Sequence, residues 1–129
     1  MKFVYISCNI SKLEQLTEEI RNLGIKTFQI VEDTAGSFEN GNPRMNTSIW
    51  PGTNAVVFLQ VTPEKCKELL ATVRRMNREI VNENERILAA SWECEDYVYS
   101  AVRLREITNN KQISKIIDFF IYASFSSSE

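Results

Sequence analysis

The sequence contains no histidine, and its 129 residues include only four glycines and three cysteines. Without histidine, the commonest acid–base group near neutral pH and the commonest zinc or copper ligand are both missing. Ser-His-Asp and Cys-His catalytic arrangements are therefore excluded. Among so few glycines there is no Walker or dinucleotide-binding motif. The sequence predicts a protein that is not an enzyme, with no catalytic residues, no metal site and no cofactor.

The three cysteines, Cys8, Cys66 and Cys94, are odd in number and far apart, unlike a disulfide framework or a paired-cysteine metal site. Each falls on an expected helix or strand, which favours buried structural thiols. No apolar stretch reaches the 18 residues of a membrane span, and the apolar run near the first residue is too short and too polar for a signal peptide. We expect a cytoplasmic protein without membrane insertion.

Charge is nearly balanced, with 15 Lys and Arg against 17 Asp and Glu, for a net charge of −2. No overall positive field exists to hold nucleic acid, so none is expected as a partner. The length and the 43% hydrophobic content are those of one globular domain. We expect this domain over residues 1–96, followed over 97–129 by a C-terminal extension made of an edge strand, a short helix or both, with a polar tail.

Hydrophobic periodicity predicts six elements. Strands are expected over residues 2–8, 26–32, 54–61 and 86–95. The first helix is expected to open on a capping box of Ser11 and Glu14 and to end at Gly24. The second is expected to follow the cap Thr62, with Pro63 in its first turn. The order β-α-β-β-α-β predicts an α+β ferredoxin-like sandwich, a four-stranded antiparallel sheet with two helices on one face.

Alternation along the first and third strands predicts a sheet that is apolar on both faces. The residues expected to face the helices are Val4, Ile6, Val57 and Leu59. Those expected on the opposite face are Phe3, Tyr5, Val56 and Phe58. Since burying apolar surface contributes about 25 cal/mol per Å², leaving the second set in water is unfavourable. We expect self-association through this face; the alternative is that residues 97–129 cover it within one chain.

A long irregular segment, EDTAGSFENGNPRMNTSIWPGTN, covers residues 32–54 between the second and third strands. Such connections in compact domains are usually working loops or linkers. The order of elements and the stretch IWPGTNAVVFLQV resemble the P-II-like, or more broadly CutA-like, small trimeric signalling proteins, which carry their effector loop at this place. The resemblance covers residues 1–96. It implies a homotrimer that binds a small-molecule effector or a partner protein through this loop and the clefts between subunits.

The loop departs from the family in ways that limit what the resemblance implies. In one subgroup it ends in a stretch of the kind GPHLGTHIWPG, where two histidines could serve a metal. This sequence reads NPRMNTSIWPG, with Arg44 and Ser48 at those two positions. The loop has no tyrosine for uridylylation, and NENERILAAS contains no glycine-rich phosphate loop. The resemblance therefore implies neither metal binding nor the usual P-II nucleotide binding.

Five residues are candidates for binding a ligand or a partner: Arg44, Asn46, Ser48, Trp50 and Asn54. The planar guanidinium of Arg44 is suited to a carboxylate or a phosphate, although a solvated loop arginine is the commoner case. Trp50, followed by Pro and Gly, is suited to the wall of a ligand cleft or to an anchor in a partner. It is equally suited to fixing the base of the loop on the sheet.

The favoured function is a non-enzymatic regulatory or sensor protein. One alternative is a small ferredoxin-like enzyme, of the cofactor-free monooxygenase or isomerase type, using Trp50, Asn46 and Asn54 in a pocket under the loop. Another is an RNA-binding domain, because the RNA-recognition motif shares this order of elements and displays aromatic residues on its open sheet. The third strand, NAVVFLQV, lacks the basic-aromatic pattern of that motif, which disfavours RNA.

Overall fold

The structure, a computed structural model, describes residues 1–99, of which Met1–Glu93 form one unit. From residue 100 onward, the predicted C-terminal strand or helix lies outside the described residues. The main elements are β1 (Lys2–Asn9), α1 (Leu13–Asn22), β2 (Gln29–Thr34), β3 (Asn54–Val61), α2 (Pro63–Arg78) and β4 (Leu88–Glu93). Two short 3-10 turns are η1 (Ile10–Lys12) and η2 (Glu83–Glu85). Among the described helices, none has the length and apolar character needed to cross a membrane.

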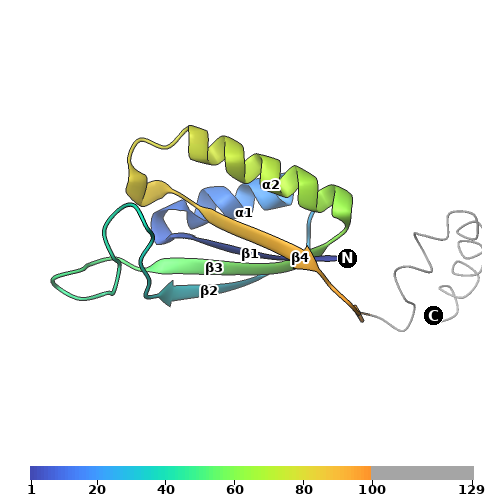
Figure 1. The fold of residues 1–129 in the computed structure, drawn as a ribbon, viewed down its shortest axis with the longest axis horizontal. Coiled ribbons are helices and arrows are strands. Elements are labelled where there is room, and N and C mark those ends of the chain that lie inside the picture. The colour runs from blue at the N-terminus through green and yellow to red at the C-terminus, as the bar shows by residue number, and fades with distance from the viewer. Residues whose placement is uncertain (100–129) are drawn as a thin grey trace, which may run out of the picture. The chain divides into compact units, whose positions relative to one another are not determined.

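The four strands form one antiparallel sheet in the order β2-β3-β1-β4. Both helices lie on the same side of this sheet, and the long connection from β2 to β3 extends beyond its end (Figure 1). The α+β ferredoxin-like fold predicted from the order of elements is confirmed. β3 and β1 are the two central strands, so the long loop leads directly into the middle of the sheet.

The first helix starts differently from the prediction. The side chain of Asn9 accepts a hydrogen bond from the Ser11 amide at 3.0 Å and caps η1, and α1 then begins at Leu13 without a side-chain cap. The expected capping box of Ser11 and Glu14 is therefore wrong, because Asn9 provides an equally good cap two residues earlier. The helix end agrees with the prediction, since Gly24 adopts a left-handed φ of +83°.

The second strand is also displaced from its predicted range of 26–32. Residues 25–28 form no pairing with the sheet, although Ile25 is buried and Phe28 packs against the core. β2 continues to Thr34 through an irregularity in pairing that includes Asp33, whose φ is +60°. Aspartate adopts left-handed conformations more readily than most residues, so it accommodates the bulge. Periodicity alone does not reveal such a bulge.

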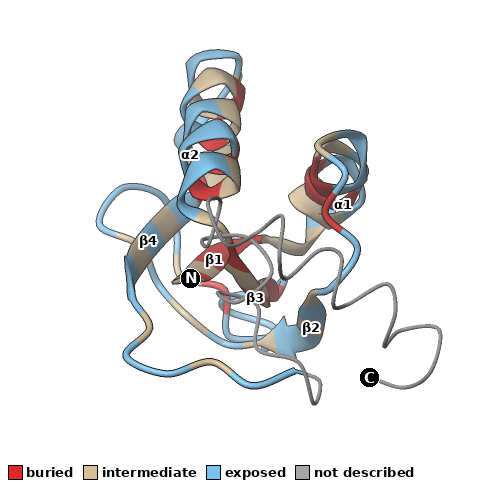
Figure 2. Ribbon diagram, turned by 90° about the vertical axis from the view of Figure 1, so that its right-hand side faces the viewer, coloured by how far each residue is buried: buried red, intermediate tan, exposed pale blue. Residues whose placement is uncertain are grey.

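The core lies between the helices and the sheet. Figure 2 shows buried residues on the sides of α1 and α2 that face the strands and along the central strands. Thr62 caps α2 by accepting from the Lys65 amide at 3.3 Å, and Pro63 occupies the first turn, both as predicted. The largest fully buried side chains are Ile6, Leu16, Ile20, Leu59, Leu69, Met76, Val4, Val57 and Cys8. Aliphatic side chains therefore occupy the space beneath the helices.

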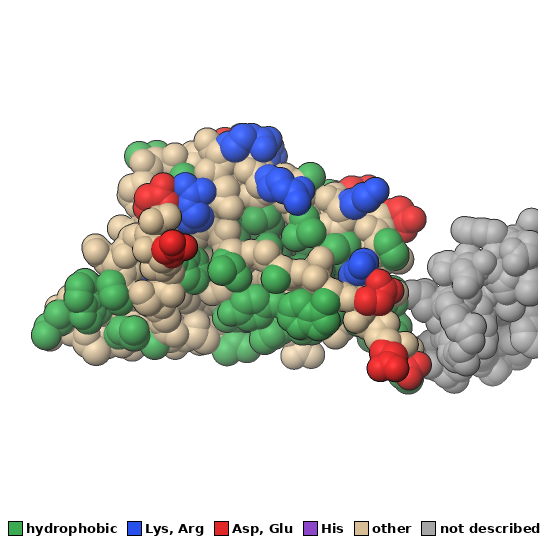
Figure 3. Space-filling view, viewed as in Figure 1, with side chains coloured by type: hydrophobic (Ala, Val, Ile, Leu, Met, Phe, Trp, Pro, Cys, Tyr) green, Lys and Arg blue, Asp and Glu red, His purple; other side chains and the backbone are tan. Residues whose placement is uncertain are grey.

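The opposite side of the sheet, which we call the open face, is apolar as predicted. It carries Phe3, Tyr5, Val56, Phe58 and Trp92, together with Val31 and Leu88. The ring centroids of Phe3 and Trp92 are 4.9 Å apart, and those of Phe3 and Phe58 are 5.9 Å apart. Hydrophobic side chains gather along the sheet in the view of Figure 3. Trp92 retains 52% of its surface exposed, so no segment of Met1–Glu93 covers this face fully.

Candidate functional site

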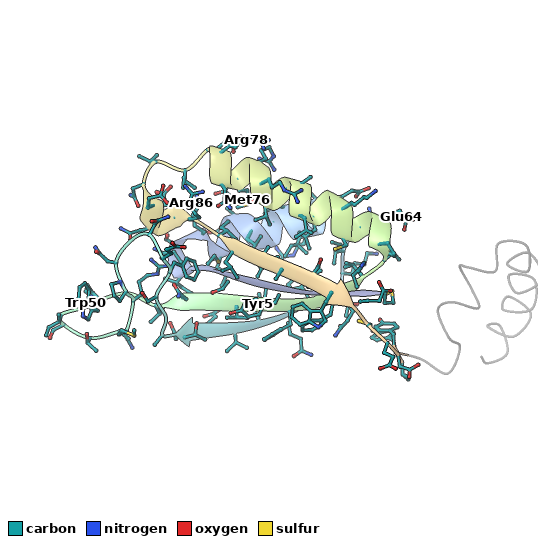
Figure 4. All side chains as sticks on the ribbon, in the orientation of Figure 1. Tyr5, Trp50, Glu64, Met76, Arg78 and Arg86 are labelled. Atoms are coloured by element: carbon teal, nitrogen blue, oxygen red, sulfur yellow. The ribbon has the colours of Figure 1, made fainter. Side chains whose placement is uncertain are left out.

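The 35–53 loop folds into two lobes. Gly36 and Arg44 exchange two backbone hydrogen bonds, of 2.9 and 2.8 Å, which close the first lobe. In the second lobe the carbonyl of Trp50 accepts from the amides of Met45 and Thr47, each at 3.0 Å. Trp50 lies in this outer lobe, far from the labelled residues of α2 (Figure 4). The long connection is therefore a loop with its own hydrogen bonds.

Three hydrogen bonds fix the base of the loop on the sheet. Thr34 Oγ1 donates to the Asn54 carbonyl at 3.0 Å, and Thr53 Oγ1 donates to Asp33 Oδ1 at 3.2 Å. The Ile10 amide donates to the Thr53 carbonyl at 3.0 Å. Both ends of the loop are thus held where β2 and β3 pair.

Arg44 is buried, with 6% of its surface exposed, whereas a solvated loop arginine was the commoner expectation. Its Nε donates to Asn54 Oδ1, and its guanidinium lies 5.3 Å from the centroid of the Phe38 ring. Nη2 is buried and has no hydrogen-bond partner among the described residues. None of the ion pairs formed within residues 1–99 involves Arg44. Burial accordingly lowers the pKa of Arg44.

A cavity of about 260 Å³, which we call the loop cavity, lies between the 35–53 loop and η2. Its lining residues are Asn9, Asn42, Pro43, Arg44, Ile49, Trp50, Pro51, Gly52 and Asn84. The lining includes the apolar side chains of Trp50 and its neighbours Ile49 and Pro51, and it also includes three asparagines. Arg44 is the one charged residue of this lining. The arrangement is chemically suited to hold a small anion with an apolar part.

Asn84 connects the loop to the rest of the protein. Its Oδ1 accepts from the Asn42 amide at 2.9 Å, and its carbonyl accepts from Asn9 Nδ2 at 3.1 Å. Gly41 has φ +102°, and a Cβ atom there would lie 2.7 Å from Asn84 Oδ1. The contact therefore needs a glycine beside it. Asn84 thus holds the first lobe of the loop against η2.

The structure brings together only some of the predicted site residues. Arg44 and Trp50 line the loop cavity, and Asn54 Oδ1 accepts a hydrogen bond from Arg44 Nε. Asn46 and Ser48 are exposed on the outer lobe and do not line it. Sequence reasoning missed Asn9 and Asn84. The available signal was an asparagine in each of two stretches that join elements, CNIS at the end of β1 and NENE after α2.

Cys8 lies near this site, on the core side of β1. Its side chain is fully buried, and burial raises the pKa of its thiol to about 11, while the charges of Arg44 and Lys12 act in the opposite direction. At neutral pH the thiol is therefore uncharged and gives Arg44 no counter-ion. Within residues 1–99, no cluster of three or more His, Cys, Asp or Glu side chains is placed to hold a metal ion.

No protein-family model matches the chain, and no curated protein matches it in sequence. Solved structures do match its fold. A PII-like signalling protein from Thermus thermophilus is 20% identical, with a TM-score of 0.52 over 70% of this chain and 82% of that one. CPII of Thiomonas intermedia K12 bound to ADP and bicarbonate is 15% identical, with a TM-score of 0.55 over 72% and 86%.

Another structure of CPII, described as a nitrogen regulatory PII-like protein bound to ADP, AMP and bicarbonate, covers 75% of this chain and 94% of that one. Its identity is 14% and its TM-score 0.53. The chain therefore has the fold of the P-II-like signalling proteins, as the sequence resemblance implied. At these identities the likeness concerns the fold, and the function has to be argued from the site.

Replacing Asn84 by alanine should loosen the first lobe of the loop, because the Asn42 amide loses its acceptor. We expect the Asn42 amide to exchange its hydrogen at least about 10-fold faster, while amides of β1 and β3 stay protected. Hydrogen exchange followed by NMR measures this. The matched control is Asn40→Ala, in an exposed part of the same lobe. Equal exchange in wild type and Asn84→Ala would show that Asn84 does not hold the loop.

The raised pKa of Cys8 predicts a loss of stability at alkaline pH. Between about pH 9 and 11 the unfolded chain releases the thiol proton and the folded protein keeps it, so the free energy of unfolding falls as pH rises. The expected decline is about 2 kcal/mol. Urea denaturation at pH 8, 9.5 and 10.5 measures it. Cys8→Ala should be less stable at pH 8 but lack this part of the decline, and Cys94→Ala should retain it.

Proposed function

We propose that the protein is a non-enzymatic regulatory or sensor protein of the P-II-like kind, which binds a small anionic ligand in the loop cavity and assembles as a homotrimer. The fold supports this, since CPII, which has the same fold, is described as a nitrogen regulatory protein and binds ADP, AMP and bicarbonate. The free, buried thiols of Cys8 and Cys66 suit the reducing cytoplasm, where we place the protein.

One observation carries the ligand-binding part of the proposal, namely the buried charge of Arg44, which has no ion-pair partner among the described residues. Removing a guanidinium from water costs roughly several kcal/mol unless an anion or a full set of acceptors compensates it. Here Nε has Asn54 as its acceptor and Nη2 has no partner within residues 1–99. Buried charged groups with an unsatisfied hydrogen-bond donor are common in binding sites, where the ligand supplies the missing partner.

The alternative enzyme reading receives no such support. A cofactor-free enzyme of this fold needs an apolar cavity under the helices, and that space is occupied by Leu16, Ile20 and Leu69. The loop cavity holds an arginine and three asparagines but no carboxylate and no thiol. Neither general acid–base nor nucleophilic catalysis has residues there to perform it.

The open face supports the proposal of self-association. Trp92, which is 52% exposed, lies against the ring of Phe3, and Val31, which is 46% exposed, lies beside Val56 on the same face. An apolar patch of this kind on a sheet is typical of an interface. The resemblance to the P-II-like proteins makes three copies of this chain the expected partners.

Ligand binding is testable through Trp50. In a Trp92→Phe variant the remaining tryptophan reports on the loop cavity, and we expect its emission to change saturably with one of a panel containing ADP, AMP, bicarbonate, acetate and benzoate. Arg44→Gln should weaken that binding at least about 10-fold, because the anion loses its cation. Arg78→Gln, on the exposed end of α2, is the matched control.

The melting temperature of Arg44→Gln is measured alongside, so that lost binding is not confused with unfolding. Should every ligand of the panel leave the emission of Trp50 unchanged, and calorimetry of the wild-type protein detect no heat of binding, the ligand-binding proposal is wrong.

Assembly is testable with charged substitutions on the open face. Phe58→Asp should dissociate the trimer or prevent folding, since an unpaired charge in a buried interface is strongly destabilising. Trp92→Glu, at a position half exposed in the single chain, should dissociate the trimer and leave the subunit folded. Native mass spectrometry gives the mass, and Val81→Asp, at an exposed turn, is the control. A trimer that survives Trp92→Glu, or a monomeric wild type, contradicts the proposed interface.

A further inference from the structure

We infer that the loop cavity selects an organic monoanion, a carboxylate attached to a flat apolar group, and discriminates against nucleoside polyphosphates. The inference rests on the proposed function, because it takes Arg44 and Trp50 to be the ligand-binding residues. It goes further by naming the class of ligand, and it separates this chain from CPII, which binds ADP.

The first argument is size. The loop cavity measures about 260 Å³. Cavities that enclose ligands of drug or nucleotide size are commonly about 300–1,000 Å³. The volume of the loop cavity therefore suits a ligand made of one ring system and one small charged group.

The second argument is charge. Arg44 is the single cation among the lining residues, and the rest of the polar lining consists of neutral asparagines. A carboxylate is neutralised by one guanidinium, with which it pairs in a planar geometry. A diphosphate or triphosphate would bring several negative charges into the same space, and all but one would be left without a cation.

The third argument concerns the backbone. Proteins commonly hold phosphates with a series of free amide groups at a helix N-terminus or in a glycine-rich turn. Among the residues that line the loop cavity, the Arg44 amide donates to the Gly36 carbonyl and the Trp50 amide donates to Thr47 Oγ1, while Pro43 and Pro51 have no amide hydrogen. The Asn42 amide donates to Asn84 Oδ1. The lining of the loop cavity therefore has no two consecutive free amides to offer a phosphate chain.

The apolar part of the lining indicates the rest of the ligand. The indole of Trp50 is flanked by Ile49 and Pro51, and all three line the cavity. Flat groups stack on an indole at little cost in conformational freedom. Asn84, whose Oδ1 is used as an acceptor, keeps its Nδ2 group as a donor for a second carboxylate oxygen.

Binding of this ligand is expected to move the loop. Nη2 of Arg44 is buried, so a carboxylate oxygen can reach it only after the residues that cover it are displaced. The strand behind Arg44 is paired on both sides and holds Asn54 in place. The displacement therefore falls on the 35–53 loop, which makes the bound state distinguishable from the free one.

The test compares ligands that differ in one property each, using the full chain with Trp92→Phe and titration of Trp50 emission. Benzoate is the flat monoanion, benzamide its neutral counterpart, acetate the anion without the ring, and ADP the polyphosphate. We expect benzoate to bind at least about 10-fold more tightly than each of the other three. Arg44→Gln should remove the preference for benzoate over benzamide, and Arg44→Lys should restore it only in part, because a point charge lacks the planar pair of donors.

The outcomes separate the two proposals. Tighter binding of ADP than of benzoate, with the same dependence on Arg44, overturns the monoanion inference and leaves ligand binding at the loop cavity intact. Equal binding of benzoate and benzamide also overturns it, because the charge then plays no role. If none of the four ligands changes the emission of Trp50 or produces heat in calorimetry, the monoanion inference is wrong, and if AMP and bicarbonate fail as well, both proposals are wrong.

Discussion

The hydrogen bond from Arg44 Nε to Asn54 Oδ1 joins the middle of the 35–53 loop to the first residue of β3, and the conformation of the loop depends on it. Arg44 reaches this position because the chain crosses closely there. A Cβ atom on Gly36 would lie 2.8 Å from Asn54 Nδ2, so no larger residue is accommodated without displacement. The two lobes are arranged on either side of this contact. Without it, the buried guanidinium would have no described hydrogen-bond partner at all.

The sheet holds Asn54, the acceptor in the hydrogen bond with Arg44, in a fixed position. β3 pairs with β1 along its whole length and with β2 on its other edge, and its core-facing side chains are buried. Asn54, Val56 and Phe58 alternate with these buried residues and so share one side of the strand. The residue that holds Arg44 and the aromatic row of the open face are thus presented by the same strand, which has little freedom to move.

Much of the fold could be predicted from the sequence because it depends on repeated apolar spacing. The bounds of β3, the cap at Thr62 and the two faces of the sheet follow from period-2 and period-3.6 patterns that extend over many residues. The start of α1 and the range of β2 could not be predicted in the same way. They depend on a competing cap at Asn9 and on a left-handed Asp33, which are single-residue choices without a periodic signal.

The candidate site was predictable only in part, for a related reason. Trp50 and Arg44 could be found because a tryptophan and an arginine are unusual in an otherwise polar, irregular segment. Asn9 and Asn84 lie 75 residues apart in the sequence. They meet only because β1 and the turn before β4 end at the same edge of the fold, which the sequence pattern does not show.

Burying Arg44 has a free-energy cost, whereas burying the apolar side chains of the core is favourable. Val4, Ile6 and Leu59 are inside because leaving water lowers their free energy, whereas the guanidinium is inside at a cost that its one described acceptor offsets only partly. A loop as long as residues 35–53 could place an arginine in water with little strain. The chain instead holds the charge against Asn54 and the ring of Phe38, at the wall of a cavity. The free-energy cost of enclosing the cation is therefore met before an anion arrives, and what binding still requires is a displacement of the residues that cover Nη2.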